Sequence, residues 1–287
     1  MTIAALEARR RTVSTSHGPI SCIDMVKGPA ALFVHGLGTN ALLWRRVFDG
    51  LAGQRRLIAL DLPLHGRSPG AADQAFGLGA LADVLEAFCA AADLDDLDLV
   101  ANDTGGGIAQ IFAAAHPERI RSLCLTNCET HDNVPPPAFK PTVDLAATGA
   151  LAAGAPRLLA DLGVARALVF GSGYEDTEHL GLDVVRSFLE PVLGTPERAH
   201  EFERLIVSLR ADDLLAAEAD LGELRTPTLI VWGTADVFFE LSWAYWLRDL
   251  IPGARDVVEV EGGRLFFPDE RPEELVDPLR AFWWDCR

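Results

Sequence analysis

An aspartate at the junction of a strand and a helix is the residue with the clearest chemical potential. Residues 97–101 form an apolar run interrupted only by Asp98, and residues 105–116 repeat apolar side chains on one helical face. Asp103 lies between them, flanked by the small residues Ala101 and Gly105. A sharp turn from strand to helix holds its central side chain exposed above a sheet, where it can act as a nucleophile. Asp could instead cap the helix, and we favour the nucleophile.

Three further segments with distinctive motifs follow apolar runs elsewhere in the chain. Residues 35–38 (His-Gly-Leu-Gly) follow an apolar run, residues 61–68 (Asp-Leu-Pro-Leu-His-Gly-Arg-Ser) follow a second, and residues 232–236 (Trp-Gly-Thr-Ala-Asp) end a third. With Asp103 they resemble the oxyanion loop, the turn after the fourth strand and the acid-bearing strand end of the α/β-hydrolase family. The resemblance covers about residues 20–132 and 224–284.

The fold predicted on this basis is an α/β-hydrolase fold, with a mostly parallel central sheet flanked by helices and an inserted helical cap. We expect the core at 1–132 and 224–287 and the cap at 133–223, where strand-like runs give way to Ala- and Leu-rich stretches. Strands are expected at 30–35, 57–60, 97–101, 123–126, 229–232 and 257–260. Helices are expected at about 41–52, 78–93, 105–116 and 270–283.

An aspartate at the elbow resembles the branch of the family that contains haloalkane dehalogenases and epoxide hydrolases. That resemblance implies attack of the Asp103 carboxylate on carbon, followed by hydrolysis of the resulting ester by a His-activated water. The backbone N–H groups of Leu37 and Thr104 would form the oxyanion hole. Asp236 would be the acid that orients the base.

The sequence departs from this branch at several positions. Leu265 stands where the family's histidine base is expected, and leucine cannot accept a proton. Thr104 replaces the halide-binding Trp that follows the nucleophile, and Leu37 replaces an Asn. Epoxide hydrolases usually have Pro where Gly38 stands and use two cap tyrosines, whereas this cap offers only Tyr174. An ester on Asp103 would therefore be hydrolysed slowly.

His131 follows the strand beside the elbow and is the candidate for a replacement base. An exposed loop position is the alternative for this histidine, and bracing of their own loops is the alternative for His35 and His65. The expected catalytic residues are thus Asp103, Asp236 and His131. The residues expected to contact the substrate are His35, Trp44, Asn127, Phe238, Leu265 and Phe266.

The missing histidine leaves three functional hypotheses open. The first is an enzyme that acts on a small, largely apolar molecule with Asp103 as nucleophile or as acid/base. The second is a non-hydrolytic catalyst, such as a lyase or isomerase, in which Asp103 moves a proton inside an apolar cavity. The third is a ligand-binding relative that has lost turnover. For each hypothesis we expect Asp103 to face a cavity beneath the cap, and we expect no cofactor and no metal.

Composition limits the partners. The formal net charge is −17, from 25 basic and 42 acidic residues, and this disfavours nucleic acid and anionic membranes. No apolar leader or membrane span is apparent, so we expect a cytoplasmic monomer or homodimer with a small-molecule substrate. The five cysteines lie mostly in apolar runs and are expected to be reduced thiols without a zinc site.

Overall fold

A twisted β-sheet organises the chain. The computed structural model describes residues 1–25, 28–71 and 73–285, and in this part of the chain eight strands form one sheet in the order β1-β2-β4-β3-β5-β6-β7-β8. Their bounds are Arg10–Thr15 (β1), Gly18–Met25 (β2), Ala30–Val34 (β3), Arg56–Leu60 (β4), Leu97–Asp103 (β5), Ile120–Cys128 (β6), Thr228–Gly233 (β7) and Ala254–Val260 (β8).

The predicted mostly parallel sheet is confirmed. The strands from β3 to β8 pair in parallel, whereas β2 runs antiparallel to both β1 and β4. The central strand β5 is buried along its whole length, as expected for a strand that is covered on both faces. Because parallel strands end at the same edge, their carboxyl ends collect polar side chains in one place.

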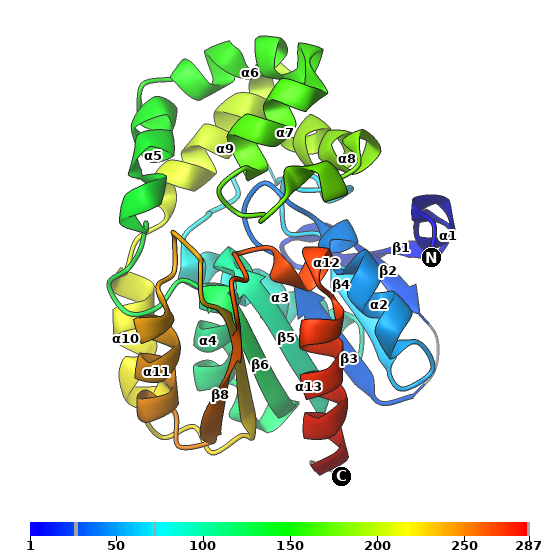
Figure 1. Cartoon of the computed structure of the whole chain (residues 1–287), viewed down its shortest axis with the longest axis vertical. Coiled ribbons are helices and arrows are strands. Elements are labelled where there is room, and N and C mark those ends of the chain that lie inside the picture. The colour runs from blue at the N-terminus through cyan, green and yellow to red at the C-terminus, as the bar shows by residue number, and fades with distance from the viewer. Residues whose placement is uncertain (26–27, 72, 286–287) are drawn as a thin grey trace.

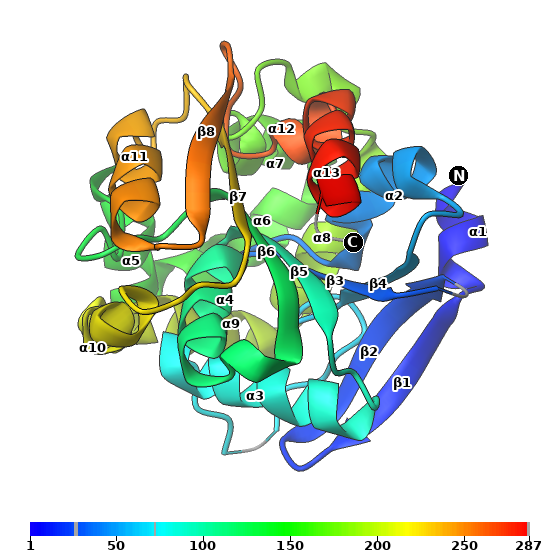
Figure 2. The same cartoon turned by 90° about the horizontal axis from the view of Figure 1, so that it is seen from below.

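Helices cover both faces of the sheet. Figure 2 places α3, α4 and α11 on one face and α2 and α13 on the other. The helical bounds are Ile3–Glu7 (α1), Arg45–Leu51 (α2), Leu78–Ala91 (α3), Thr104–Ala115 (α4), Lys140–Ala147 (α5), Ala150–Ala160 (α6), Leu162–Phe170 (α7), Leu182–Leu193 (α8), Pro196–Ser208 (α9), Asp212–Leu221 (α10), Leu241–Leu250 (α11), Phe267–Glu270 (α12) and Glu273–Asp285 (α13). Within the described part of the chain, no helix is long and apolar enough to cross a membrane.

The helices α5 to α9 form a cap above the carboxyl ends of the strands (Figure 1). The sixth helix of the segment expected as cap, α10, packs instead against α4 and α3 of the core. We therefore propose that the cap ends with α9 and that α10 belongs to the core.

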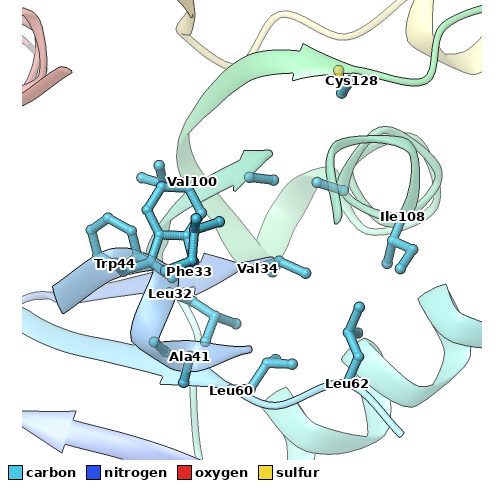
Figure 3. Packing of buried hydrophobic residues seen from close by; sticks show 14 of the residues in the cluster. Leu32, Phe33, Val34, Ala41, Trp44, Leu60, Leu62, Val100, Ile108 and Cys128 are labelled. Atoms are coloured by element: carbon cyan, nitrogen blue, oxygen red, sulfur yellow. The ribbon is translucent and has the colours of Figure 1, made fainter. Parts of the chain in front are cut away.

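Aromatic and aliphatic side chains fill the space between the sheet and its helices. Trp44, which follows β3, packs beside Phe33 with ring centroids 5.3 Å apart, and Ile108 of α4 covers the opposite face (Figure 3). Four cysteines (Cys22, Cys89, Cys124 and Cys128) are buried free thiols, and Cys286 lies outside the described residues.

The strands β1 and β2 and the helices α1 and α11 escaped the sequence prediction. The hairpin of β1 and β2 lies at the edge of the sheet, and only Val13 of β1 is buried, so this strand lacks a continuous apolar run. Helix α11 was also missed, because its aromatic side chains sit in a segment too short for a clear period. The expected helix at 270–283 is divided into α12 and α13 at Pro272, whose ring cannot continue a helix.

Candidate active site

The turn between β5 and α4 holds Asp103 in a strained backbone conformation. Its φ of 57° and ψ of −138° lie where residues other than glycine seldom occur. Neighbouring glycines make the turn possible, because a Cβ atom on Gly36 would lie 2.2 Å from Oδ2 of Asp103. A Cβ atom on Gly105 would lie 2.5 Å from the carbonyl oxygen of His35. The strain and the close approach fix the carboxyl group at the carboxyl edge of the sheet.

Two backbone N–H groups bind the Asp103 carboxyl group. They belong to Leu37 and Thr104, the residues whose N–H groups were expected to form an oxyanion hole. Thr104 is also the first residue of α4, so the positive end of the helix dipole points at the same group. This arrangement favours negative charge on one oxygen of Asp103.

Glu129 is a second buried carboxyl group at this edge, and the sequence analysis missed it. It follows β6, the neighbour of β5, and is 3% exposed. The Thr104 hydroxyl donates a hydrogen bond of 2.8 Å to Oε1, and Oε2 has no partner among the described residues. A polar residue directly after a buried parallel strand was the available signal, because such strand ends meet at one edge.

A third carboxyl group, that of Asp236, lies after β7. It is 7% exposed and accepts hydrogen bonds from Asn127 Nδ2 at 2.8 Å and from the Phe238 N–H at 2.9 Å. Asn127 also exchanges hydrogen bonds with the backbone of Gly233. Asn127, which we expected to contact substrate, thus bridges β6 and β7 and positions Asp236.

Burial raises the pKa values of all three carboxyl groups. The pKa of Asp103 rises well above its usual range because of burial and then because of the negative charges of Glu129 and Asp236. Burial raises the pKa of Glu129 to about 7 and that of Asp236 to about 7. Neighbouring buried carboxylates cannot all ionise at neutral pH. The cluster therefore keeps protons in the pH range in which enzymes work.

A cavity of about 470 Å³ opens between the carboxyl edge of the sheet and the cap. Asp103 and Glu129 are the ionisable side chains among the described residues that line it. The remaining lining is mostly aliphatic and aromatic, with hydroxyl groups only from Thr142 and Ser172. The residues expected at the site that do line it are Leu37, Asp103, Phe238, Leu265 and Phe266.

This architecture agrees with comparisons to known proteins. The sequence model of the alpha/beta hydrolase fold family matches residues 29–271, most of the chain. The chain belongs to the α/β hydrolase fold family. The predicted fold is thereby confirmed.

Individual relatives match either most of the chain at low identity or a shorter segment at higher identity. The chain is 25% identical to "Uncharacterized protein Rv2715" of Mycobacterium tuberculosis over 261 residues, which cover 89% of this chain and 75% of the relative. It is 38% identical to a haloalkane dehalogenase of Mesorhizobium japonicum over 96 residues, only 33% of this chain and 31% of the relative. The structure of the haloalkane dehalogenase DatA from Agrobacterium tumefaciens C58 has a TM-score of 0.82 at 19% identity and covers 97% of both chains, which shows a shared fold.

No histidine of this α/β hydrolase is among the described residues that line the cavity. Nδ1 of His131 hydrogen-bonds with Oε1 of Glu218 in α10, and its ring contacts Trp243 and Trp246 of α11. The imidazole thus packs against α10 and α11. The structure therefore does not bring the candidate base His131 to the cavity.

Two other histidines brace the oxyanion loop. His35 is fully buried, with Nδ1 2.8 Å from the Gly36 carbonyl oxygen and Nε2 accepting the Leu62 N–H at 3.0 Å. His65 Nε2 accepts the Gly38 N–H at 3.2 Å. Burial lowers the pKa of His35 to about 4 and that of His65 to about 3, so both rings are neutral. His35 and Trp44, both expected to contact substrate, lie beneath the cavity instead.

Leu265 faces the cavity from the loop after β8. Its carbonyl oxygen accepts a hydrogen bond of 3.0 Å from Asn102 Nδ2, and its neighbour Phe266 donates its N–H to Gly173 of the cap at 2.9 Å. The loop is thus fixed to both the core and the cap. An apolar side chain therefore occupies the position where the family resemblance predicts an imidazole.

Proposed function

We propose that this chain is a hydrolase-type enzyme in which the Asp103 carboxylate attacks a carbon atom of a small, uncharged, largely apolar substrate. The observation that carries the proposal is the placement of Asp103 at the floor of an apolar cavity, with N–H groups of Leu37 and Thr104 on its carboxyl group. The fold and the dehalogenase relatives support this reaction class.

The arrangement suits displacement at a saturated carbon. A carboxylate needs no base to remove a proton before it attacks, whereas a serine would. One oxygen of Asp103 bonds to carbon while the other stays with the two N–H groups. These donors then stabilise the oxyanion that forms when water attacks the ester, a contribution of about 3–4 kcal/mol per well-placed donor in other enzymes.

The cavity indicates the substrate class. Its phenylalanines and aliphatic side chains favour burial of a hydrocarbon group, at about 25 cal/mol per Å² of apolar surface. No Lys or Arg is among the described residues that line it. Because two carboxyl groups share the cavity and no cation compensates them, phosphorylated or otherwise anionic ligands would be repelled.

The decisive experiment is intact-protein mass spectrometry after incubation with 1-bromohexane, styrene oxide and 4-nitrophenyl butyrate. An ester on Asp103 from the first two compounds, or a mixed anhydride from the third with release of 4-nitrophenolate, increases the protein mass by the transferred group. The increase is absent from Asp103→Asn, which keeps the shape but is a poor nucleophile. If the parent shows neither a covalent adduct nor product release with any of the three compounds, Asp103 is not the nucleophile.

A second candidate is non-hydrolytic proton transfer by Asp103 on a bound carbonyl compound, as in an isomerase or lyase. It is favoured by the raised pKa of Asp103 and by the lack of an imidazole among the described residues that line the cavity. It predicts solvent deuterium uptake into the substrate without a covalent adduct. A ligand-binding relative without turnover would instead be stabilised thermally by an apolar compound. It would show neither a covalent adduct nor deuterium uptake into the compound.

A further inference from the structure

We propose that Glu129 is a second catalytic residue, which donates a proton to a leaving oxygen atom and then accepts a proton from water. This inference rests on the proposed function, because Glu129 completes a reaction that Asp103 begins. It removes the need for the histidine that Leu265 replaces.

The position of Glu129 carries the proposal. Its carboxyl group lines the same cavity as Asp103, although the residue is only 3% exposed. Oε1 accepts the Thr104 hydroxyl at 2.8 Å, which leaves Oε2 as the oxygen without a partner among the described residues. A buried charge without a hydrogen-bond donor is strongly unfavourable. A proton on Oε2 removes that cost and creates a donor for the substrate.

Thr104 links the two carboxyl groups and gives them different tasks. Its N–H donates to Asp103, and its hydroxyl donates to Glu129. A backbone N–H can only donate, so the Asp103 oxygens it faces must accept, and Leu37 adds a second such donor. When Asp103 is ionised and Glu129 is protonated, the charge on Asp103 faces two fixed N–H donors, and Oε2 of Glu129 can carry the proton. The first step proceeds from this arrangement of the shared proton.

The groups around Glu129 keep that proton in place near neutral pH. The titratable side chains that face it are the carboxyls of Asp103 and Asp236 and the thiol of Cys128. None of them is a cation, and burial raises the pKa of Glu129 to about 7. In such a coupled cluster, the carboxyl groups of Asp103 and Glu129 share one proton.

The proposed reaction conserves protons. In the first step the Asp103 carboxylate forms a bond to carbon, the carbon–oxygen bond of the substrate breaks, and the leaving oxygen takes the proton of Glu129. In the second step the Glu129 carboxylate accepts a proton from water as that water attacks Cγ of Asp103. The ester bond then breaks, the departing alkoxide takes this proton, and Asp103 is left as the acid. Transfer of its proton back to Glu129 restores the starting state.

These reaction steps suit a substrate whose leaving atom is oxygen better than one whose leaving group is a halide. A halide departs as an anion and needs hydrogen-bond donors, and the cavity side chains offer hydroxyl groups only from Thr142 and Ser172. A strained cyclic ether instead needs a proton on its oxygen, which Glu129 supplies. Two carboxyl groups that alternate as acid and base serve retaining glycosidases in the same way.

The test compares the parent with Glu129→Gln, using styrene oxide and 1-bromohexane as probes. We expect diol release from styrene oxide to fall by about 10² to 10⁴ in Glu129→Gln, the usual contribution of general acid–base catalysis. Ester formation from 1-bromohexane should persist, because bromide needs no proton. Glu86→Gln, which removes a carboxylate on α3 outside the cavity, is the matched control and should leave both rates unchanged.

Three outcomes would overturn the inference, and they are distinguishable. Equal diol release by the parent and Glu129→Gln would exclude Glu129 and leave the role of Asp103 intact. An ester from 1-bromohexane alone, with no reaction of styrene oxide, would contradict a leaving oxygen. No reaction of either probe, with parent and Asp103→Asn indistinguishable, would remove the proposed function itself.

A second variant keeps the test valid if Glu129→Gln folds poorly. Thr104→Val removes the hydroxyl that lowers the pKa of Glu129 but keeps the N–H on Asp103. Since the first step needs Glu129 protonated, its rate falls as pH rises through that pKa. The alkaline limb of the styrene oxide reaction should therefore move to higher pH in Thr104→Val, and an unmoved limb would count against Glu129.

Discussion

At the scale of single residues, Gly36 determines where the Asp103 carboxyl group can lie. In Gly36→Ala the new methyl group would lie 2.2 Å from Oδ2 of Asp103 and 2.4 Å from its Cβ and Cγ atoms. We expect the side chain of Asp103 to be displaced, at a cost of about 1–3 kcal/mol. Ester formation with 1-bromohexane should be lost. Denaturant unfolding and mass spectrometry measure the two effects.

Gly154 provides the control for this substitution. It lines the cavity within α6, and a Cβ atom there would meet nothing within 4 Å. Gly154→Ala should therefore keep ester formation and stabilise the protein by about 0.5–1 kcal/mol through helix propensity. Normal ester formation in Gly36→Ala would show that the position of the Asp103 carboxyl group does not depend on the absence of a side chain at residue 36.

The proton on Glu129 makes stability depend on pH in a defined direction. Burial raises the pKa of Glu129 from 4.5 to about 7, so between these values the folded protein binds more protons than the unfolded chain. The contribution is complete below the unfolded pKa and is lost as pH rises through about 7. For one isolated group of this kind the loss is about 3 kcal/mol.

Glu129→Gln should remove that contribution. We expect the free energy of unfolding of the variant, measured in denaturant from about pH 5 to about pH 8, to fall less steeply than that of the parent. Asp103 and Asp236, whose pKa values are also raised, supply the slope that remains. Identical slopes for both proteins would mean that Glu129 is ionised throughout.

At the scale of elements, the loop after β8 determines whether water can be activated. Asn102 and Gly173 hold its backbone, and the side chain of Leu265 faces the cavity. Leu265→His should therefore place an imidazole near Asp103, with Asp236 available to orient it. We expect hydrolysis of the Asp103 ester to accelerate by about 10² to 10⁴.

The ester trapped in Glu129→Gln after exposure to 1-bromohexane gives a direct measurement of this effect. The rate at which its mass returns to that of free protein should be higher in the double variant Glu129→Gln, Leu265→His. An unchanged rate, with the fold intact by circular dichroism, would mean that no water reaches the ester at this position.

At the scale of the whole molecule, stability and chemistry reside at opposite edges of the sheet. Near the amino end of β5, the buried carboxylate of Asp98 binds Arg55 Nε at 2.7 Å, Arg121 Nη2 at 2.6 Å and the Ser122 hydroxyl at 2.6 Å. Asp103, at the other end of the same strand, has like-charged neighbours instead. The negative charge of Asp98 is thus compensated by two arginines, whereas that of Asp103 is not.

We expect the two carboxylates to respond oppositely to substitution. Asp98→Ala leaves the buried Arg55 unpaired and should cost about 3–5 kcal/mol. Asp103→Asn should leave the free energy of unfolding unchanged or raise it at about pH 8, because it removes a buried negative charge. Thermal and denaturant unfolding of both variants test this contrast, which a large destabilisation by Asp103→Asn would refute.

The local sequence predicted those strands, turns and helices whose pattern of apolar and polar residues lies within one continuous segment. The run of β5 into α4 identified the strand, the turn and Asp103, because burial on both faces and a helical period leave their pattern in consecutive residues. The parallel arrangement of the sheet followed from the alternation of such strands with helices along the chain. The hairpin of β1 and β2 was missed because an edge strand does not need that pattern.

Tertiary structure alone decided which side chains meet at the cavity. Glu129 joins Asp103 because the successive parallel strands β5 and β6 end side by side, whereas Asn127, two residues earlier, turns to Asp236. His131 lies close to Glu129 in sequence but faces α10 and α11. A strand end fixes where a residue lies, but the direction of its side chain depends on partners that distant elements supply, and those partners leave no trace in the local sequence.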